Sequence, residues 1–219
     1  MPALLFDLDG TLLNSDPIHE QVFKELWRAR GLPMDDAFYM QHIHGRLNVD
    51  VFAEFLPDEP DPQALSAWKE AQFRDRLPDH YPATPGLDAI LTLADDCGWR
   101  TAIVTNAMRL NAYAMLDAIG MRDRFEVIVI GEECARGKPH PDPYLAAMDM
   151  LNAGPTDCVA FEDSPSGMRS AAASGAYPVG VRSGLTDAAL RAAGARITIQ
   201  DFNDPALSDI LTRLKGVVA

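Results

Sequence analysis

The regular alternation of short apolar runs with helix-like segments after Gly86 limits the possible folds more than any other feature of this sequence. The expected strands cover 101–104, 127–130, 158–161 and 178–181, and helices are expected at 87–97, 112–119, 144–151 and 166–174. Short buried runs separated by helices are typical of βαβ units. The pattern therefore predicts a parallel sheet covered by helices.

The first part of the chain has a different pattern. One more short apolar run, at 3–6, precedes a long stretch with helical periodicity, in which three amphipathic helices are predicted around 18–27, 51–55 and 65–77. A proline-rich segment ends this stretch before Gly86. We therefore predict an α/β fold with a Rossmann-like parallel-sheet core, made of residues 1–14 and 83–219. An all-helical cap with its linkers is expected at 15–82.

Charge and hydropathy exclude several classes of partner. A net charge of −13 over 219 residues argues against nucleic acid, whose phosphates require a basic surface. No apolar run approaches the roughly 18 residues needed to cross a bilayer, and the N-terminus lacks the pattern of a signal peptide. The three cysteines lack metal-site spacing. We expect a cytoplasmic protein without a membrane partner, either a monomer or a homodimer.

The run at 3–6 leads into Asp7-Leu8-Asp9-Gly10-Thr11. In an extended segment residues two apart face the same side, so Asp7 and Asp9 can share a site at the carboxyl end of a strand, where open α/β sheets bind ligands. Two close carboxylates repel each other, and Mg²⁺ relieves this repulsion because it prefers oxygen ligands. A surface turn capped by aspartates is the alternative for this motif alone. A calcium EF-hand loop fits poorly, because Gly10 comes too early.

Polar residues also follow the predicted strands at 101–104 and 158–161. The pairs are Thr105 with Asn106 and Glu162 with Asp163. Lys138, one of only four lysines, stands between glycine and proline in a predicted loop. Each of these signals alone also fits a helix cap or a solvated surface residue.

Taken together, these residues suit phosphoryl transfer. A carboxylate at Asp7 could attack phosphorus, and a cation would screen the repulsion between the two anions. Lys138, the hydroxyl of Thr105 and the turn amides at Asn106 could hold the transferring oxygens. The order of these motifs, each beyond an apolar run, is much more specific than any one of them.

The chain resembles hydrolases of the haloacid dehalogenase (HAD) superfamily, in the phosphatase and β-phosphoglucomutase-like branch that carries a helical cap. The matching motifs are Asp7-Leu8-Asp9-Gly10-Thr11, Thr105-Asn106, Lys138 and Glu162-Asp163. The resemblance implies that Asp7 is the nucleophile and that Asp9 is the general acid and then the base. It also implies Mg²⁺ held by Asp7, the main-chain carbonyl of Asp9 and Asp163, with Glu162 in or near the coordination shell.

The resemblance also separates possible reactions. Dehalogenases of this superfamily lack the second aspartate of the first motif, and Asp9 is present here. The favoured function is hydrolysis of a small phosphorylated metabolite, such as a sugar phosphate or a phosphoglycolate-like acid. A phosphosugar mutase is the first alternative, because His19 stands where mutases also carry a histidine. However, Gly45-Arg46-Leu47-Asn48 departs from the Gly-x-Ser-Arg motif of mutases. A non-catalytic binding protein with the same fold is the remaining alternative.

Four cap residues are predicted to contact the substrate, namely His19, Arg46, Asn48 and Lys69. Arg46 offers a fork of donors for a carboxylate or phosphate, and Asn48 can donate to or accept from a hydroxyl. Both stand in an expected loop between cap helices. The alternative for Arg46 and Lys69 is an ordinary solvated side chain.

Overall fold

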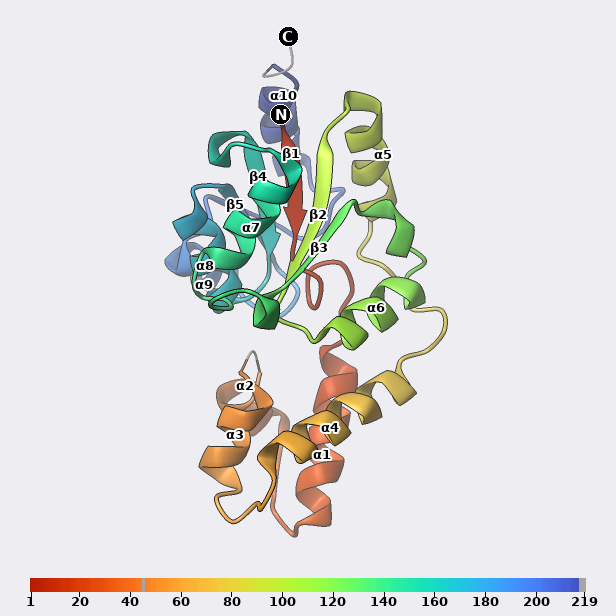
Figure 1. Cartoon of the computed structure of the whole chain (residues 1–219), viewed down its shortest axis with the longest axis vertical. Coiled ribbons are helices and arrows are strands. Elements are labelled where there is room, and N and C mark those ends of the chain that lie inside the picture. The colour runs from red at the N-terminus through yellow and green to blue at the C-terminus, as the bar shows by residue number, and fades with distance from the viewer. Residues whose placement is uncertain (45, 217–219) are drawn as a thin grey trace. The chain divides into compact units, whose positions relative to one another are not determined.

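The residues after Gly86 and the first short run form one parallel sheet (Figure 1). The computed structural model describes residues 1–44 and 46–216, and in this part of the chain the sheet has six strands in the order β3-β2-β1-β4-β5-β6. The strands are β1 Ala3–Phe6, β2 Arg100–Thr105, β3 Val127–Ile130, β4 Cys158–Glu162, β5 Tyr177–Val181 and β6 Ile197–Ile199. The predicted α/β fold class is confirmed. The strand that sequence analysis missed, β6, has only three residues.

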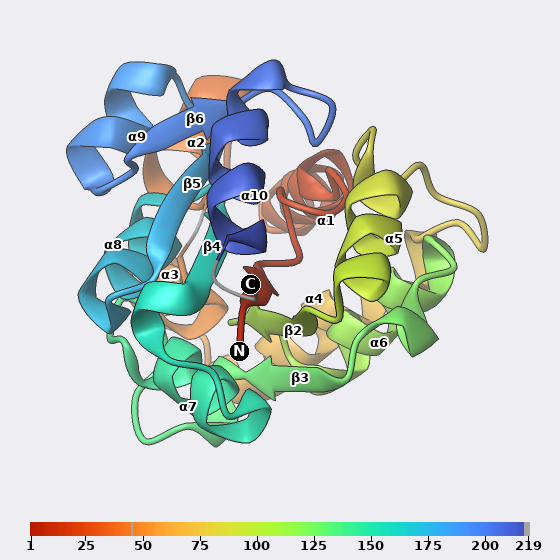
Figure 2. The ribbon, with the colours of Figure 1, turned by 90° about the horizontal axis from the view of Figure 1, so that it is seen from above.

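Helices cover both faces of this sheet, as short parallel connections require. The α-helices are α5 Leu87–Cys97, α6 Arg109–Ala118, α7 Asp142–Leu151, α8 Pro165–Ser174, α9 Asp187–Ala193 and α10 Ser208–Lys215. Short 3₁₀ turns lie at η1 Arg122–Arg124, η2 Gly131–Glu133, η3 Pro155–Asp157 and η4 Pro205–Leu207. Figure 2 shows α7 and α8 on one face of the sheet and α5 and α10 on the other.

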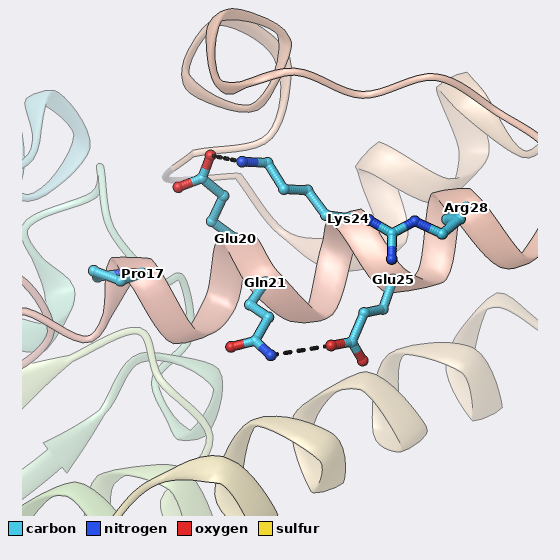
Figure 3. Close-up of a pocket in the computed structure, with 6 residues that line it drawn as sticks. All are labelled: Pro17, Glu20, Gln21, Lys24, Glu25 and Arg28. Carbon is cyan, nitrogen blue, oxygen red and sulfur yellow. Dashed lines mark hydrogen bonds and ion pairs between the residues drawn. The ribbon is translucent and has the colours of Figure 1, made fainter.

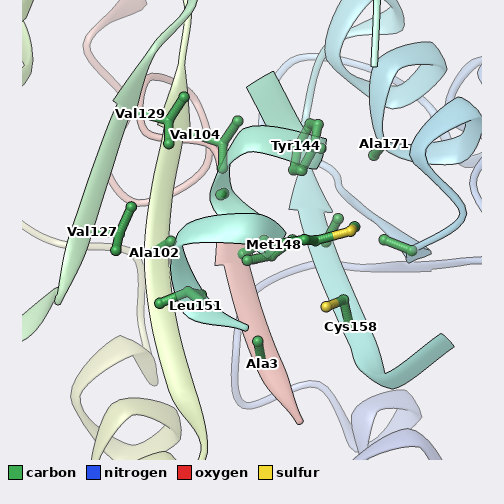
Figure 4. Close-up of a cluster of buried hydrophobic side chains, with 14 residues drawn as sticks. Ala3, Ala102, Val104, Val127, Val129, Tyr144, Met148, Leu151, Cys158 and Ala171 are labelled. Atoms are coloured by element: carbon green, nitrogen blue, oxygen red, sulfur yellow. The ribbon is translucent and has the colours of Figure 1, made fainter. Parts of the chain in front are cut away.

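The two faces of β1 pack against different cores, because successive side chains of a strand point to opposite sides. Ala3 and Leu5 join a buried cluster beneath α7 that includes Tyr144 and Met148 (Figure 4). On the other face the ring of Phe6 stacks on that of Phe161, with ring centroids 4.9 Å apart and an interplanar angle of 10°. Phe6 and Phe161 immediately precede Asp7 and Glu162, so this packing fixes the ends of β1 and β4.

The chain divides into two compact units. One combines Met1–Asn14 with Asp79–Ala219, and the other is Ser15–Pro78. Residues 79–82, which the sequence assigns to the cap and its linkers, belong to the α/β unit in the structure. Tyr81 accounts for this difference, because its amide donates to the carbonyl of Ala118 at 2.9 Å and its hydroxyl donates to that of Asn14 at 2.8 Å.

The unit Ser15–Pro78, called the cap below, is helical, as the sequence predicts. Its helices are α1 Asp16–Ala29, α2 Asp36–His42, α3 Asn48–Phe55 and α4 Pro62–Arg76. Sequence analysis predicted three of these and missed the short α2. Aromatic and aliphatic side chains from α1, α2 and α3, with Trp27 and Phe52 at the centre, form its core. Trp68, on α4, is 44% exposed and lies outside this core.

Candidate active site

The strand order places two acidic motifs next to each other. β1 pairs with β4, with Phe6 opposite Phe161, and the amide of Asp7 donates to the carbonyl of Phe161 at 2.9 Å. Asp7 therefore lies beside Glu162, the last residue of β4. The connections run in opposite directions from β1 and β4, so this is the switch point at which open α/β sheets bind ligands.

Three carboxylates meet at this switch point. Asp7, Glu162 and Asp163 each offer an oxygen, and these oxygens all lie within 4.8 Å of one another. Glu162 is fully buried, and Asp7 and Asp163 are 7% and 5% exposed. Buried carboxylates this close repel one another strongly unless cations compensate their charge. Sequence analysis named all three, and the structure brings them together.

Gly10 allows the first motif to approach Asp163. Its φ of +81° lies in the left-handed region, and a Cβ atom placed on it would lie only 2.0 Å from Oδ2 of Asp163. Any other residue would therefore be strained and would displace the carboxylate. The turn is closed by the amide of Gly10, which donates to the carbonyl of Leu13 at 2.8 Å.

Asp9, the predicted general acid, occupies the same turn. Its backbone forms an isolated bridge with Leu13. Asp9 is not a member of the three-carboxylate group. The metal contact expected of Asp9 uses its main-chain carbonyl, and that contact stays a prediction, as does its role as acid and base.

Lys138 is buried against these carboxylates, which rules out the solvated surface lysine. Its Nζ donates to Oδ1 of Asp7 at 2.7 Å, to Oε1 of Glu162 at 2.5 Å and to the carbonyl of Val104 at 2.6 Å. The Lys138 side chain is 3% exposed. All three of its donors are therefore used by partners at the ends of β1, β2 and β4.

The protonation behaviour of the cluster follows from this burial. Desolvation raises the pKa of Asp7 to about 8, with a smaller contribution from Glu162, while Lys138 opposes the rise. Desolvation alone would lower the pKa of Lys138, but the two carboxylates outweigh it and raise that pKa. Three carboxylates and one ammonium leave a formal excess of two negative charges when all are ionised. A divalent cation would cancel this excess.

The donor set therefore fits Mg²⁺. The three carboxylates offer oxygen ligands that lie close to one another and carry negative charge, and these are the features that Mg²⁺ requires. Asp7 and Asp163 would hold this ion, and Glu162 offers a third carboxylate oxygen beside them. The hydroxyl of Ser183, which follows β5, donates to Oδ2 of Asp163 at 3.1 Å and orients it.

The second motif lies at the end of β2. Thr105 is buried, and its hydroxyl oxygen accepts from the amide of Ala107 at 3.0 Å. The side-chain amide of Asn106 donates to the carbonyl of Lys138 at 3.2 Å and accepts from the amide of Lys138 at 3.1 Å. The Asn106 side chain therefore fixes the backbone that carries Lys138, a function that sequence analysis did not assign to it.

Sequence analysis missed Tyr144 and Ser183 as members of the site. Tyr144, in the first turn of α7, donates its hydroxyl to Oε1 of Glu162 at 2.7 Å. In the sequence it stands only as an apolar helix position. Ser183 stands just beyond the carboxyl end of a predicted strand, so the rule that identified Thr105 and Asp163 could have found it.

The cap places the predicted substrate residues in two groups. His19 and Lys69 lie together, with Nζ of Lys69 2.6 Å from Nδ1 of His19 and 2.9 Å from Oε1 of Glu70. Lys69 is 3% exposed, so its interpretation as a solvated helix lysine is wrong. Asn48 starts α3 and donates to Oε1 of Glu70 at 2.6 Å, which joins it to the same group.

Arg46 lies apart from that group. Its guanidinium donates to the carbonyl of His42 at 2.9 Å and to Oε2 of Glu54 at 2.8 Å. Gly45, which was expected to break the helical pattern here, lies outside the described residues. On either side of it, α2 ends at His42 and α3 begins at Asn48.

A shallow hollow of about 370 Å³ lies on α1 of the cap (Figure 3). Its lining residues are Pro17, Glu20, Gln21, Lys24, Glu25 and Arg28. Lys24 pairs with Glu20 at 2.8 Å, and Gln21 donates to Glu25 at 3.1 Å. The hollow is the outer face of one charged helix, and none of the predicted site residues lines it.

The protein has a parallel sheet with a carboxylate–lysine cluster at its switch point, and its chain carries a helical cap inserted after β1. These features define an α/β enzyme. The family model described as haloacid dehalogenase-like hydrolase matches residues 1–175. The chain therefore belongs to this family of hydrolases, and the resemblance found in the motifs is confirmed.

Relatives of known name agree with this assignment. The chain is 33% identical to the protein CbbY of Rhodobacter capsulatus over 80% of its length and 82% of the relative. It is 31% identical to hexitol phosphatase A of Escherichia coli, with 82% of each chain covered. A crystal structure of a HAD hydrolase from Entamoeba histolytica superposes with a TM-score of 0.88 at 27% identity, covering 98% of this chain and all of the other.

Between residues 1 and 216, Gly45 apart, none of the helices is both long and apolar enough to cross a membrane.

Proposed function

We propose that the chain is a magnesium-dependent phosphatase that hydrolyses a small phosphorylated metabolite through an aspartyl-phosphate on Asp7. The observation that carries the proposal is the contact of Lys138 with both Asp7 and Glu162 at the switch point of the sheet. A buried ammonium beside a buried carboxylate is suited to receive a phosphoryl group, because it offsets the charge that accumulates between the two.

In the proposed reaction Oδ of Asp7 attacks phosphorus, and the bond from phosphorus to the leaving alcohol oxygen breaks. Asp9 gives its proton to that alcohol. Water then attacks the phosphorus of the aspartyl-phosphate, and Asp9, now a carboxylate, takes up the proton of that water. Phosphate leaves, and Asp7 returns to its starting state.

Lys138, Thr105 and the backbone at Asn106 would hold the phosphoryl oxygens during both steps. Mg²⁺, when bound by Asp7 and Asp163, would screen the repulsion between the carboxylates and the phosphoryl group. The buried position of the cluster favours such electrostatic stabilisation, because charges interact more strongly away from water.

The substrate class rests on the relatives. Hexitol phosphatase A, by its name, acts on phosphorylated hexitols, and its match covers 82% of this chain. We therefore propose a phosphorylated sugar or sugar alcohol as the substrate, with a phosphoglycolate-like acid as the second class to be tested.

The test is release of inorganic phosphate from p-nitrophenyl phosphate and from a panel of phosphorylated sugars, polyols and acids. Phosphate release that needs Mg²⁺ and stops on chelation is expected. Full activity in a verified metal-free preparation would contradict the metal requirement. Conversion of a hexose 1-phosphate to its 6-phosphate without phosphate release would favour the mutase alternative.

A further inference from the structure

Tyr144 is a buried polar side chain at the site that the proposed reaction does not use. Tyr144 is fully buried, and its ring belongs to the apolar cluster between α7 and the sheet (Figure 4). A buried tyrosine hydroxyl needs a hydrogen-bond partner, and many partners could serve this purpose. Here the partner is the carboxylate of Glu162, at 2.7 Å.

The two oxygens of Glu162 have unequal environments. Oε1 accepts from both Nζ of Lys138 and the hydroxyl of Tyr144, at 2.5 and 2.7 Å. Within the part of the chain that the structure describes, Oε2 accepts one hydrogen bond, a long one of 3.4 Å from Oγ of Ser164. Two short bonds thus converge on one oxygen and leave the other for a further partner.

We propose that Tyr144 is a positioning residue, which holds Oε1 of Glu162 against Lys138 so that Oε2 stays available to the divalent cation. This inference rests on the proposed function only in assigning a cation to the carboxylate cluster. The terminal torsion of a glutamate is soft, so one bond to Lys138 would let the carboxylate turn both oxygens towards the ammonium. The second donor, approaching from α7, restricts that rotation.

The carboxylate of Glu162 joins the Lys138 loop to helix α7, because Lys138 and Tyr144 both donate to it. Lys138 comes from the loop after β3, Glu162 from the end of β4 and Tyr144 from α7. Partners of this kind orient ligating carboxylates, and their loss typically weakens metal binding or activity about 10–100-fold. The hydroxyl of Tyr144 therefore matters for the cation, whereas its ring matters for the core.

The substitution Tyr144→Phe separates these two contributions, since it keeps the ring and removes the hydroxyl. We expect the Kd for Mg²⁺, measured by calorimetry on the full chain without substrate, to rise about 10-fold or more. Tyr177→Phe is the matched control, because Tyr177 is the first residue of β5, at the end of the strand away from the site, and packs its ring against Arg196. The control should bind Mg²⁺ as the unmodified protein does.

A second pair of variants tests whether Tyr144 acts through Glu162. In the Glu162→Gln background the oxygen offered to the cation is replaced by an amide nitrogen, so adding Tyr144→Phe should not weaken Mg²⁺ binding further. An equal loss in both backgrounds would overturn the proposal. So would a Tyr144→Phe protein that melts at a lower temperature yet keeps its Mg²⁺ affinity, because that result indicates a purely structural hydroxyl.

The binding measurement also separates this inference from the proposed reaction. A protein that binds Mg²⁺ in a Tyr144-dependent manner but hydrolyses no phosphate ester would support the positioning role and contradict the phosphatase. Alternatively, the unmodified protein could hydrolyse phosphate esters while the Tyr144→Phe variant binds Mg²⁺ with unchanged affinity. That result would support the phosphatase and contradict the positioning role. An unmodified protein that does not bind Mg²⁺ would overturn the positioning role.

Discussion

Asp7 combines burial, a lysine contact and a position beside a second carboxylate. Desolvation raises the pKa of Asp7, so cations are needed to stabilise its ionised form. The ammonium of Lys138 is one such cation. A carboxylate prepared in this way is suited to nucleophilic attack, because it is held in place and only weakly solvated. Its role can be tested separately from its structural contacts.

Asp7→Asn should abolish turnover while leaving the fold intact, because the amide has the same shape but is a far poorer nucleophile than a carboxylate. Phosphate release measures the loss, and circular dichroism checks the fold. In the unmodified protein, a single turnover in ¹⁸O-labelled water should place the label in the released phosphate and leave Asp7 unlabelled, because water attacks phosphorus and the bond from phosphorus to the Asp7 oxygen breaks. An Asn variant with normal activity would show that another group attacks phosphorus.

Lys138→Ala should slow turnover about 100-fold or more, since one preorganised donor to a transferring group contributes about 2.7–4 kcal/mol. Lys215→Ala, at the exposed end of α10, is the matched control for loss of a lysine. Steady-state kinetics on p-nitrophenyl phosphate gives the comparison. A loss below about threefold would remove Lys138 from the reaction.

Much of the site at this scale could be predicted from sequence. Asp7, Glu162 and Asp163 follow apolar runs, and parallel strands bring such positions to one edge. Tyr144 could not be predicted, because its ring satisfies the helical apolar pattern and the pattern carries no information about a hydroxyl. The contact of Asn106 with the backbone of Lys138 could not be predicted either, since local residue spacing carries no information about hydrogen bonds to distant backbone.

At the scale of elements, the loop that carries Lys138 is fastened to the end of β2. Asn106 makes two hydrogen bonds to the backbone of Lys138, and η2 passes directly against it. A Cβ atom placed on Gly131 would lie 2.1 Å from Oδ1 of Asn106. The absence of a side chain at Gly131 is therefore needed for the Asn106 contacts that position Lys138.

Gly131→Ala should consequently lower kcat and destabilise the fold by about 1–3 kcal/mol, because the added methyl group forces Asn106 away from the Lys138 backbone. Gly184→Ala is the matched control, since a Cβ there meets nothing within 4 Å. Thermal unfolding and steady-state kinetics are measured on both. A Gly131→Ala protein with unchanged kcat would show that Lys138 does not depend on this contact.

The elements that could be predicted are those with several buried positions in phase. The runs that became β1 to β5 are almost wholly buried, and the helices between them carry apolar stripes. β6 has three residues and α2 has seven, too few for periodicity to distinguish them from loops. The boundary at Pro78 was set by hydrogen bonds of Tyr81, which are tertiary contacts.

At the scale of the whole molecule, the cap is an insertion that leaves the sheet undisturbed. The two chain segments that flank it are joined inside the α/β unit, where Thr84 donates its amide to the carbonyl of Leu12 at 2.7 Å and its hydroxyl to that of Thr11 at 2.8 Å. An insertion whose ends meet costs the host fold little. The cap has its own buried core, so its exposed residues can vary in sequence without disturbing the α/β unit. We propose that these residues determine substrate choice, while the chemistry stays at Asp7.

Arg46 is the cap residue with which this division of labour can be tested. Its side chain is 35% exposed and its guanidinium pairs with Glu54, so it is fixed in place yet still accessible to an anionic or polar group. We expect Arg46→Ala to lower kcat/KM about tenfold or more on the best metabolite, the loss typical of a hydrogen bond to a charged group, while p-nitrophenyl phosphate, which offers the cap few contacts, is hydrolysed normally. Arg28→Ala, on the exposed face of α1, is the matched control. Equal losses on both substrates would instead assign Arg46 to folding or to movement of the cap through its bonds to His42 and Glu54, and no loss on either would leave it a surface residue.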